Sequence, residues 1–261
     1  MHLKRELYPI EELPVLDQLE ALFRDWRECC AKSQHEVVSA QADYMVFDGF
    51  YPFYFRQPVR ILFVGREARG IEGCNYLDVL FHAYRVSKTI GDKHLNFDAF
   101  HSRKLHIAWG LLNGMPDWET IPWASEIGNS FGSESGISFA FMNLSKLSNE
   151  SDQWSSDWKI IKAFHDSATV ARNFVLEEVV LLKPNIVITM NLGDRLKSLG
   201  NMELIDRTPN VNSYWLDSDG HRSLMLDCYH FSAPGKGHVA SYYAPICKAV
   251  CDAHAARSTQ I

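Results

Sequence analysis

Polar side chains directly follow four apolar runs of this sequence. Arg66 and Glu67 come after the first run, Asn143 after the second, Asn191 after the third and His230 after the fourth. A carboxylate and an imidazole can transfer protons, and an amide can hold a polar ligand. Ligands of open α/β sheets bind beyond the carboxyl ends of the strands. If the runs are neighbouring strands, these five rim residues meet in one candidate site.

The four runs are typical of strands that are covered on both faces. Such continuous apolar runs favour a parallel sheet, and they span residues 59–64, 137–142, 186–190 and 224–226. Four segments with apolar residues at helical spacing separate or flank these runs, over residues 15–32, 103–112, 164–182 and 239–255. Residues 214–226 are predicted to form a hairpin that leads into the last strand.

Strands that alternate with helices predict crossover connections. We therefore expect an α/β fold: one three-layer α/β/α domain with a mainly parallel central sheet of about four strands. A helical extension is expected over about residues 1–57, and the core over about residues 58–255. The aromatic-rich residues 47–55, with Gly49 and Pro52, are expected to be irregular.

Composition limits the class of protein. The chain has 261 residues, 46% of them hydrophobic and 22% charged, as in globular proteins. No apolar run reaches the roughly 20 residues of a membrane span, and residues 1–7 do not resemble a signal peptide. We expect a cytoplasmic monomer without membrane contact. A net charge of −6 argues weakly against nucleic acid as a partner, because phosphate contacts need a basic surface.

Neither a metal nor a cofactor is expected. The six cysteines show no disulfide framework and no C-x-x-C pair, so buried small hydrophobes are favoured over an iron–sulfur site. His101 and His106 have no further ligands nearby. Gly128, Ser130 and Gly132 match a nucleophile elbow in form, but no buried strand precedes them, so the match is interpreted as chance.

Four motifs in order resemble those of the uracil-DNA glycosylase superfamily. The run 61–70, ILFVGREARG, is similar to the strand and loop that present the water-activating residue. The run 141–144, FMNL, is similar to the strand whose asparagine reads the pyrimidine. The run 183–188, KPNIVI, resembles the lead-in to the third strand, and 230–235, HFSAPG, resembles the closing motif. The resemblance covers roughly residues 58–250.

The resemblance implies a DNA glycosylase that leaves an abasic site after flipping a nucleotide out of the duplex. Glu67 would position water and stabilise the oxocarbenium-like sugar, and His230 would donate a hydrogen bond to O2 of the departing base. Asn143 would read the base edge, and Tyr76 would stack on the base. The loop after the last motif would approach the DNA through Ser232, Gly235, Lys236 and Gly237.

Departures from the family pattern bear on the substrate. Arg69 stands where the uracil-specific branch has a tyrosine that excludes C5 substituents. We therefore expect a C5-modified pyrimidine, such as glucosylated hydroxymethylcytosine, with Arg66 or Arg69 contacting the substituent or a phosphate. A role in phage defence would follow, because some bacterial members excise such bases. Plain uracil excision in repair is the alternative substrate.

Each of these residues also has a plain structural interpretation. Glu67 could be a solvated loop residue, Asn143 a capping residue and His230 a half-buried histidine. Arg66, Arg69 and Lys236 could be ordinary surface charges, and Asn191 is favoured as a turn residue. Two rival functions remain open: a catalytically silent nucleic-acid-binding module on the same fold, and a hydrolase of nucleosides or other small ligands.

Overall fold

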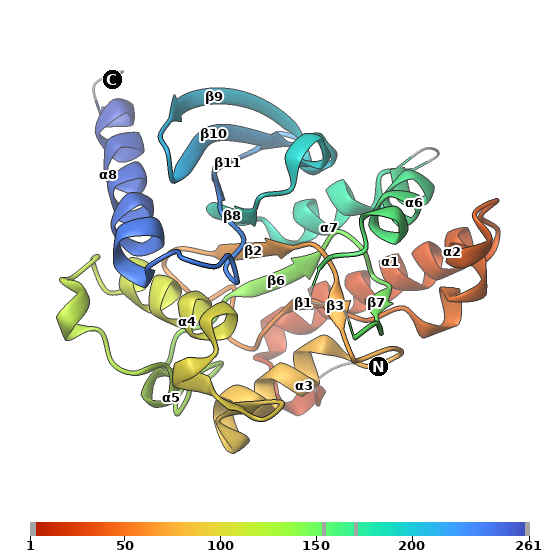
Figure 1. The fold of residues 1–261 in the computed structure, drawn as a ribbon, viewed down its shortest axis with the longest axis horizontal. Helices are drawn as coiled ribbons and strands as arrows, with labels where there is room; N and C mark the ends of the chain where they lie inside the picture. Colours follow the sequence, from red (N-terminus) through yellow and green to blue (C-terminus); the bar gives the residue numbers. More distant parts are fainter. Residues whose placement is uncertain (1–3, 153–154, 170–171, 259–261) are drawn as a thin grey trace.

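A seven-stranded mixed sheet forms the centre of the molecule (Figure 1). The computed structural model describes residues 4–152, 155–169 and 172–258. The strand order is β1-β6-β2-β8-β11-β10-β9. The strands are β1 (Gly49–Phe50), β2 (Ile61–Gly65), β6 (Ala140–Asn143), β8 (Ile186–Met190), β9 (Asn201–Arg207), β10 (Val211–Ser218) and β11 (His221–Cys228).

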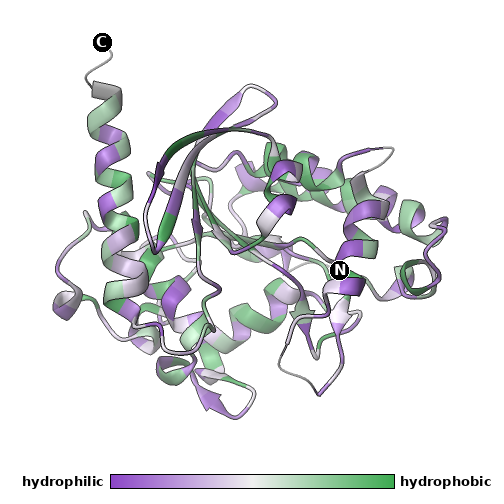
Figure 2. Ribbon diagram, turned by 45° about the horizontal axis from the view of Figure 1, so that its top comes forward, coloured by the Kyte–Doolittle hydropathy of each residue, from purple (hydrophilic) through white to green (hydrophobic). Residues whose placement is uncertain are grey.

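The four middle strands, β6, β2, β8 and β11, run parallel to one another. Every residue of β2, β6 and β8 is buried, which explains why these strands are continuous apolar runs in the sequence. Their carboxyl ends therefore lie at the same edge of the sheet. In Figure 2 the central strands are mostly green, the colour of hydrophobic residues, and purple, hydrophilic segments lie mostly outside them.

The edges of the sheet are antiparallel, so the predicted fold class, a mainly parallel sheet of about four strands, was wrong. β1 pairs antiparallel with β6, β10 with β11, and β9 with β10. β9 was missed because almost all of its residues are exposed and its sequence, NMELIDR, has no apolar run. β1 was missed because it has two residues within an aromatic-rich segment.

One face of the sheet is covered by α1 (Leu13–Ala31), α6 (Trp158–Thr169) and α7 (Phe174–Leu182). Trp26 of α1 is fully buried, and its ring lies 5.6 Å from Phe164 of α6 and 5.4 Å from Phe174 of α7. The indole therefore joins the three helices. The predicted helix over residues 164–182 is two helices in the structure.

The opposite face carries α3 (Tyr76–His82) and α4 (Ala99–Leu112), which pack on the rings of β6. Asp98 caps α4 by accepting a hydrogen bond from the His101 amide at 2.8 Å. A π-helical turn, Val239–Tyr243, leads into α8 (Ala244–Ser258), which packs on β10 and β11. Other elements are α2 (Glu36–Ala40), α5 (Ala124–Ile127), several short 3-10 helices, and two small sheets, β3 (Ala68–Arg69) with β7 (Ser148–Asn149) and β4 (Thr89–Ile90) with β5 (Lys93–His94).

Candidate active site

Asn143 ends β6 directly beside Gly65, which ends β2. A Cβ at Gly65 would lie 2.5 Å from Asn143 Oδ1, so the absent side chain of Gly65 leaves room for the amide. Asn143 is 2% exposed, and its Nδ2 has no hydrogen-bond partner among the described residues. A buried amide N–H without a partner is costly, so this group is suited to a ligand.

A buried ionic triad fixes the backbone of Asn143. The Asn143 amide donates to Asp48 Oδ2 at 2.7 Å. Lys146 Nζ donates to Asp48 Oδ1 at 2.6 Å and to Glu178 Oε2 at 2.7 Å, and all three side chains are at most 1% exposed. Burial raises the pKa of Glu178 well above its usual range, against the attraction of Lys146. The Lys146 ammonium thus faces two carboxyl groups, and burial favours the protonated form of Glu178.

Glu67 is half-buried in the loop after β2. Its Oε1 accepts hydrogen bonds from Asn149 Nδ2 at 3.0 Å and from the Asp157 amide at 3.2 Å. Burial raises the pKa of Glu67, while these two hydrogen bonds and the charge of Arg69 lower it. The carboxyl group is therefore fixed in orientation and poised as a proton acceptor.

His230 is a neutral hydrogen-bond donor at the end of β11. Its Nδ1 accepts a hydrogen bond from the Ser232 amide at 3.2 Å, which leaves the ring proton on Nε2. Burial, followed by the charges of Arg66, Arg103 and Lys104, lowers the pKa of His230 to about 4. At neutral pH the imidazole therefore presents Nε2–H without a positive charge.

The loop after His230 is attached to α4 through Arg103. The Arg103 guanidinium donates hydrogen bonds to the main-chain oxygen of Phe231 and to that of Lys236, the latter at 2.6 Å. Gly235 has φ +70°, which favours glycine, and a Cβ at Gly237 would meet open space. Ser232, Gly235 and Gly237 are exposed, and Lys236 Nζ lies 3.7 Å above the Tyr229 ring. Arg103 was not predicted, because an arginine on a helix is typical of a surface.

Arg66 belongs to a cationic cluster that the sequence did not reveal. Its guanidinium lies 4.7 Å from the centre of the Trp158 ring, and that of Arg195 lies 5.0 Å from it. Arg66 also donates to the main-chain oxygen of Asn191 at 3.2 Å. Trp158 is 38% exposed, so aromatic surface and two cations meet beside the rim. Asn191 has φ +56° and lies in a turn. Its main-chain amide donates a hydrogen bond to Asp227 Oδ1 at 3.1 Å.

Tyr76 and Arg69, two further predicted contacts of the base, are each engaged with other parts of the protein. Tyr76 is buried, and its ring stacks on Phe141 with centres 4.8 Å apart, so that face of Tyr76 is occupied. Arg69 donates to the main-chain oxygens of Ser151 at 3.0 Å and Ser155 at 3.4 Å. The half-buried aromatic beside the rim is Phe100, whose ring centre is 5.4 Å from that of His230.

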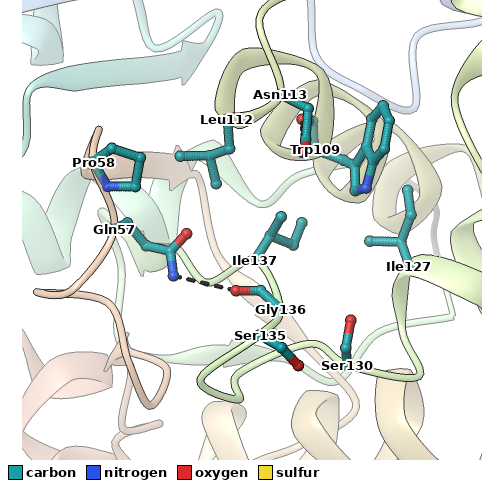
Figure 3. Close-up of a pocket in the computed structure, with 10 residues that line it drawn as sticks. All are labelled: Gln57, Pro58, Trp109, Leu112, Asn113, Ile127, Ser130, Ser135, Gly136 and Ile137. Carbon is teal, nitrogen blue, oxygen red and sulfur yellow. Dashed lines mark hydrogen bonds between the residues drawn. The ribbon is translucent and has the colours of Figure 1, made fainter.

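Two cavities of the structure are lined by residues other than the rim residues. One, of about 180 Å³, lies between Gln57, Trp109 and the segment 130–137, where Gln57 Nε2 donates to Gly136 O (Figure 3). The other, of about 500 Å³, lies between β10 and α8. The candidate site is therefore defined by the rim side chains rather than by either cavity.

Within the described ranges, no three His, Cys, Asp or Glu side chains are grouped so that they could hold a metal ion. In the same part of the chain, no helix is long and apolar enough to cross a membrane.

Comparison with known proteins gives no match to a family model, a curated protein or a solved structure. The family resemblance of the four motifs therefore stays a prediction.

Proposed function

We propose that this protein is a DNA N-glycosylase that hydrolyses the bond between deoxyribose and a flipped pyrimidine. The observation that carries the proposal is the set of groups at the carboxyl ends of β2, β6 and β11: a fixed carboxyl group, a buried amide whose Nδ2 has no partner among the described residues, and a neutral imidazole. This set, Glu67, Asn143 and His230, matches the needs of glycosidic bond cleavage.

Each group has a role in the proposed reaction. Asn143 Nδ2 and Oδ1 bind the edge of the base, since Nδ2 has no partner among the described side chains and backbone. His230 Nε2–H donates to O2 as the C1′–N1 bond breaks and its electron pair passes to the base. Glu67 accepts a proton from the water that adds to C1′ and stabilises the cationic sugar.

The surface around the rim supports a nucleic-acid substrate despite the net charge of −6. Arg66 and Lys236 are on loops that follow β2 and β11, and Arg195 is on the 3-10 helix Gly193–Leu199 that follows β8. Local charge, rather than net charge, determines whether a phosphate backbone can dock. Trp158 adds a partly exposed ring on which an unpaired base can stack.

The proposed substrate carries a C5 substituent. Arg69, at the position of the excluding tyrosine in the family resemblance, extends toward the carbonyls of Ser151 and Ser155. An arginine held there leaves the C5 side of the base without the steric block. Glucosylated hydroxymethylcytosine is the proposed example, and phage defence the proposed role.

The test uses duplex and single-stranded oligonucleotides that contain uracil, mispaired thymine, hydroxymethylcytosine or glucosylated hydroxymethylcytosine. Alkali after incubation reveals abasic sites. We expect cleavage at one modified base, its loss in Glu67→Gln, and its retention in Glu72→Gln, an exposed glutamate in the segment after β3. DNA binding without cleavage of any base would favour the silent binding module. Cleavage of free nucleosides, with no effect of salt, would favour the small-ligand hydrolase.

A further inference from the structure

Lys104 is a fully buried lysine on α4, and its Nζ has no hydrogen-bond partner in the part of the chain that the structure describes. We infer that Lys104 Nζ is a contact of the excised base: it donates to a carbonyl or ring-nitrogen acceptor on the base edge and stabilises the base as it leaves. This inference rests on the proposed glycosylase function.

The surroundings of the amine connect it to the candidate site. Lys104 Nζ lies 4.1 Å from the centre of the Phe141 ring and 4.5 Å from that of Phe100. Phe141 and Asn143 are two residues apart on β6 and so project from the same face, and a Cβ at Gly65 would meet both. Phe100 also lies against His230. The two rings thus bring the amine beside the groups proposed to bind the base.

In the described part of the chain, Asp98 makes no hydrogen bond to Lys104. It attracts the amine electrostatically, but its Oδ1 accepts the His101 amide as the cap of α4. Burial holds the pKa of the Lys104 amine well below its usual range. Because both the amine and the ammonium donate hydrogen bonds, the donor role holds in either state.

Lys146 shows what a structural buried lysine looks like in this same chain. It is as deeply buried as Lys104, but it contacts two carboxyl groups, of Asp48 and Glu178. A buried cation is normally paired in this way, because an unpaired one is costly. Among the described residues, Lys104 Nζ has no such partner, and the neutral amide Nδ2 of Asn143 has no hydrogen-bond partner either. Two buried donors fit the edge of a modified cytosine, whose acceptors are the O2 carbonyl oxygen and the N3 ring nitrogen.

The reaction gives the amine a catalytic role. When the C1′–N1 bond breaks, its electron pair stays on the base, and the negative charge spreads over the ring nitrogens and carbonyl oxygens. Lys104 contacts a neutral base before the reaction and a base that becomes an anion during it. The hydrogen bond from Lys104 to the base is therefore stronger in the transition state. The bond to water forms at C1′ on the sugar, and its proton passes to Glu67, so Lys104 need not transfer a proton.

The decisive variant is Lys104→Met, which keeps the length of the side chain and removes the polar group. We expect its melting temperature to rise, because a buried amine without a hydrogen-bond partner among the described residues is replaced by an apolar group among aromatic rings. We expect its single-turnover excision rate on the substrate base to fall about 100-fold. Lys146→Met is the matched control, and its melting temperature should fall.

Binding separates a base contact from a general defect. In the Glu67→Gln background, Lys104→Met should weaken binding to the oligonucleotide with the substrate base, and leave binding to the same oligonucleotide with a tetrahydrofuran abasic site unchanged. Equal weakening of both, or a lower melting temperature, would overturn the inference in favour of a structural role. Excision that Lys104→Met leaves unchanged would overturn the inference alone. A wild-type protein that excises no base of the panel would overturn the proposed function, and the base contact with it.

Discussion

The buried triad beneath Asn143 makes a quantitative prediction for Lys146→Met. The substitution leaves Asp48 and Glu178 in contact without their ammonium, at an exposure of at most 1%. Removing one partner of a buried ion pair costs about 3–5 kcal/mol. Unfolding entropy of roughly 2.1 cal/mol/K per residue over 261 residues makes 1 kcal/mol equivalent to about 2 °C. We therefore expect the melting temperature to fall by roughly 6–10 °C.

The pH dependence of this defect has a defined direction. Burial raises the pKa of Glu178 well above 4.5 in the folded state, and without Lys146 nothing in the triad opposes that shift. A carboxyl group with a raised folded pKa favours folding below its unfolded pKa, and this contribution is lost as the pH rises through the folded pKa. The deficit of Lys146→Met should therefore shrink as the pH falls toward about 4.5.

Urea unfolding followed by circular dichroism measures the deficit across pH. Asp48→Asn and Glu178→Gln together in the Lys146→Met protein should restore most of the lost stability, since no buried charge then lacks a partner. The asparagine oxygen still accepts the Asn143 amide. A deficit that is independent of pH, or that the two amides do not relieve, would refute the electrostatic reasoning.

Three further predictions concern the rim. Gly65→Ala places a methyl group 2.5 Å from Asn143 Oδ1, so the amide must move and single-turnover excision should slow about 100-fold. An unchanged rate would show that the position of the amide is unimportant. Burial raises the pKa of Glu67 above 4.5, so excision that needs its carboxylate should decline as the pH falls through that raised pKa, and a flat profile would speak against Glu67 as the base. Arg66→Gln should lower the slope of log Kd against log salt concentration for DNA by about one, and an equal slope would exclude a phosphate contact there.

The sequence predicted the middle of the sheet better than its edges. β8 coincides with the apolar run 186–190, because both faces of that strand are buried. Nearly every residue of β9 is exposed, and its sequence has no continuous apolar run, so a hydrophobicity pattern cannot identify this strand. The direction of β10 followed from its turn: Asp217 to Gly220 was interpreted as a hairpin, and β10 does pair antiparallel with β11.

The order of residues along the strands predicted which groups lie at the carboxyl edge, but not their partners. Glu67 and His230 follow β2 and β11, and Asn143 is the last residue of β6. Lys104 and Arg103 could not be recognised, because a basic pair within a helix is ordinarily solvated, and only the tertiary packing buries it. The position of Phe100 beside His230 could not be predicted either, because it depends on how α4 packs.

The attachment of the 230–238 loop affects how this protein can change over evolution. Arg103 binds the loop through the main-chain oxygens of Phe231 and Lys236, groups that every amino acid carries. Exposed side chains between them, such as Ser232, can therefore be exchanged without releasing the loop from α4. A lineage could alter the surface that meets a ligand here by point substitution, while the loop keeps its position.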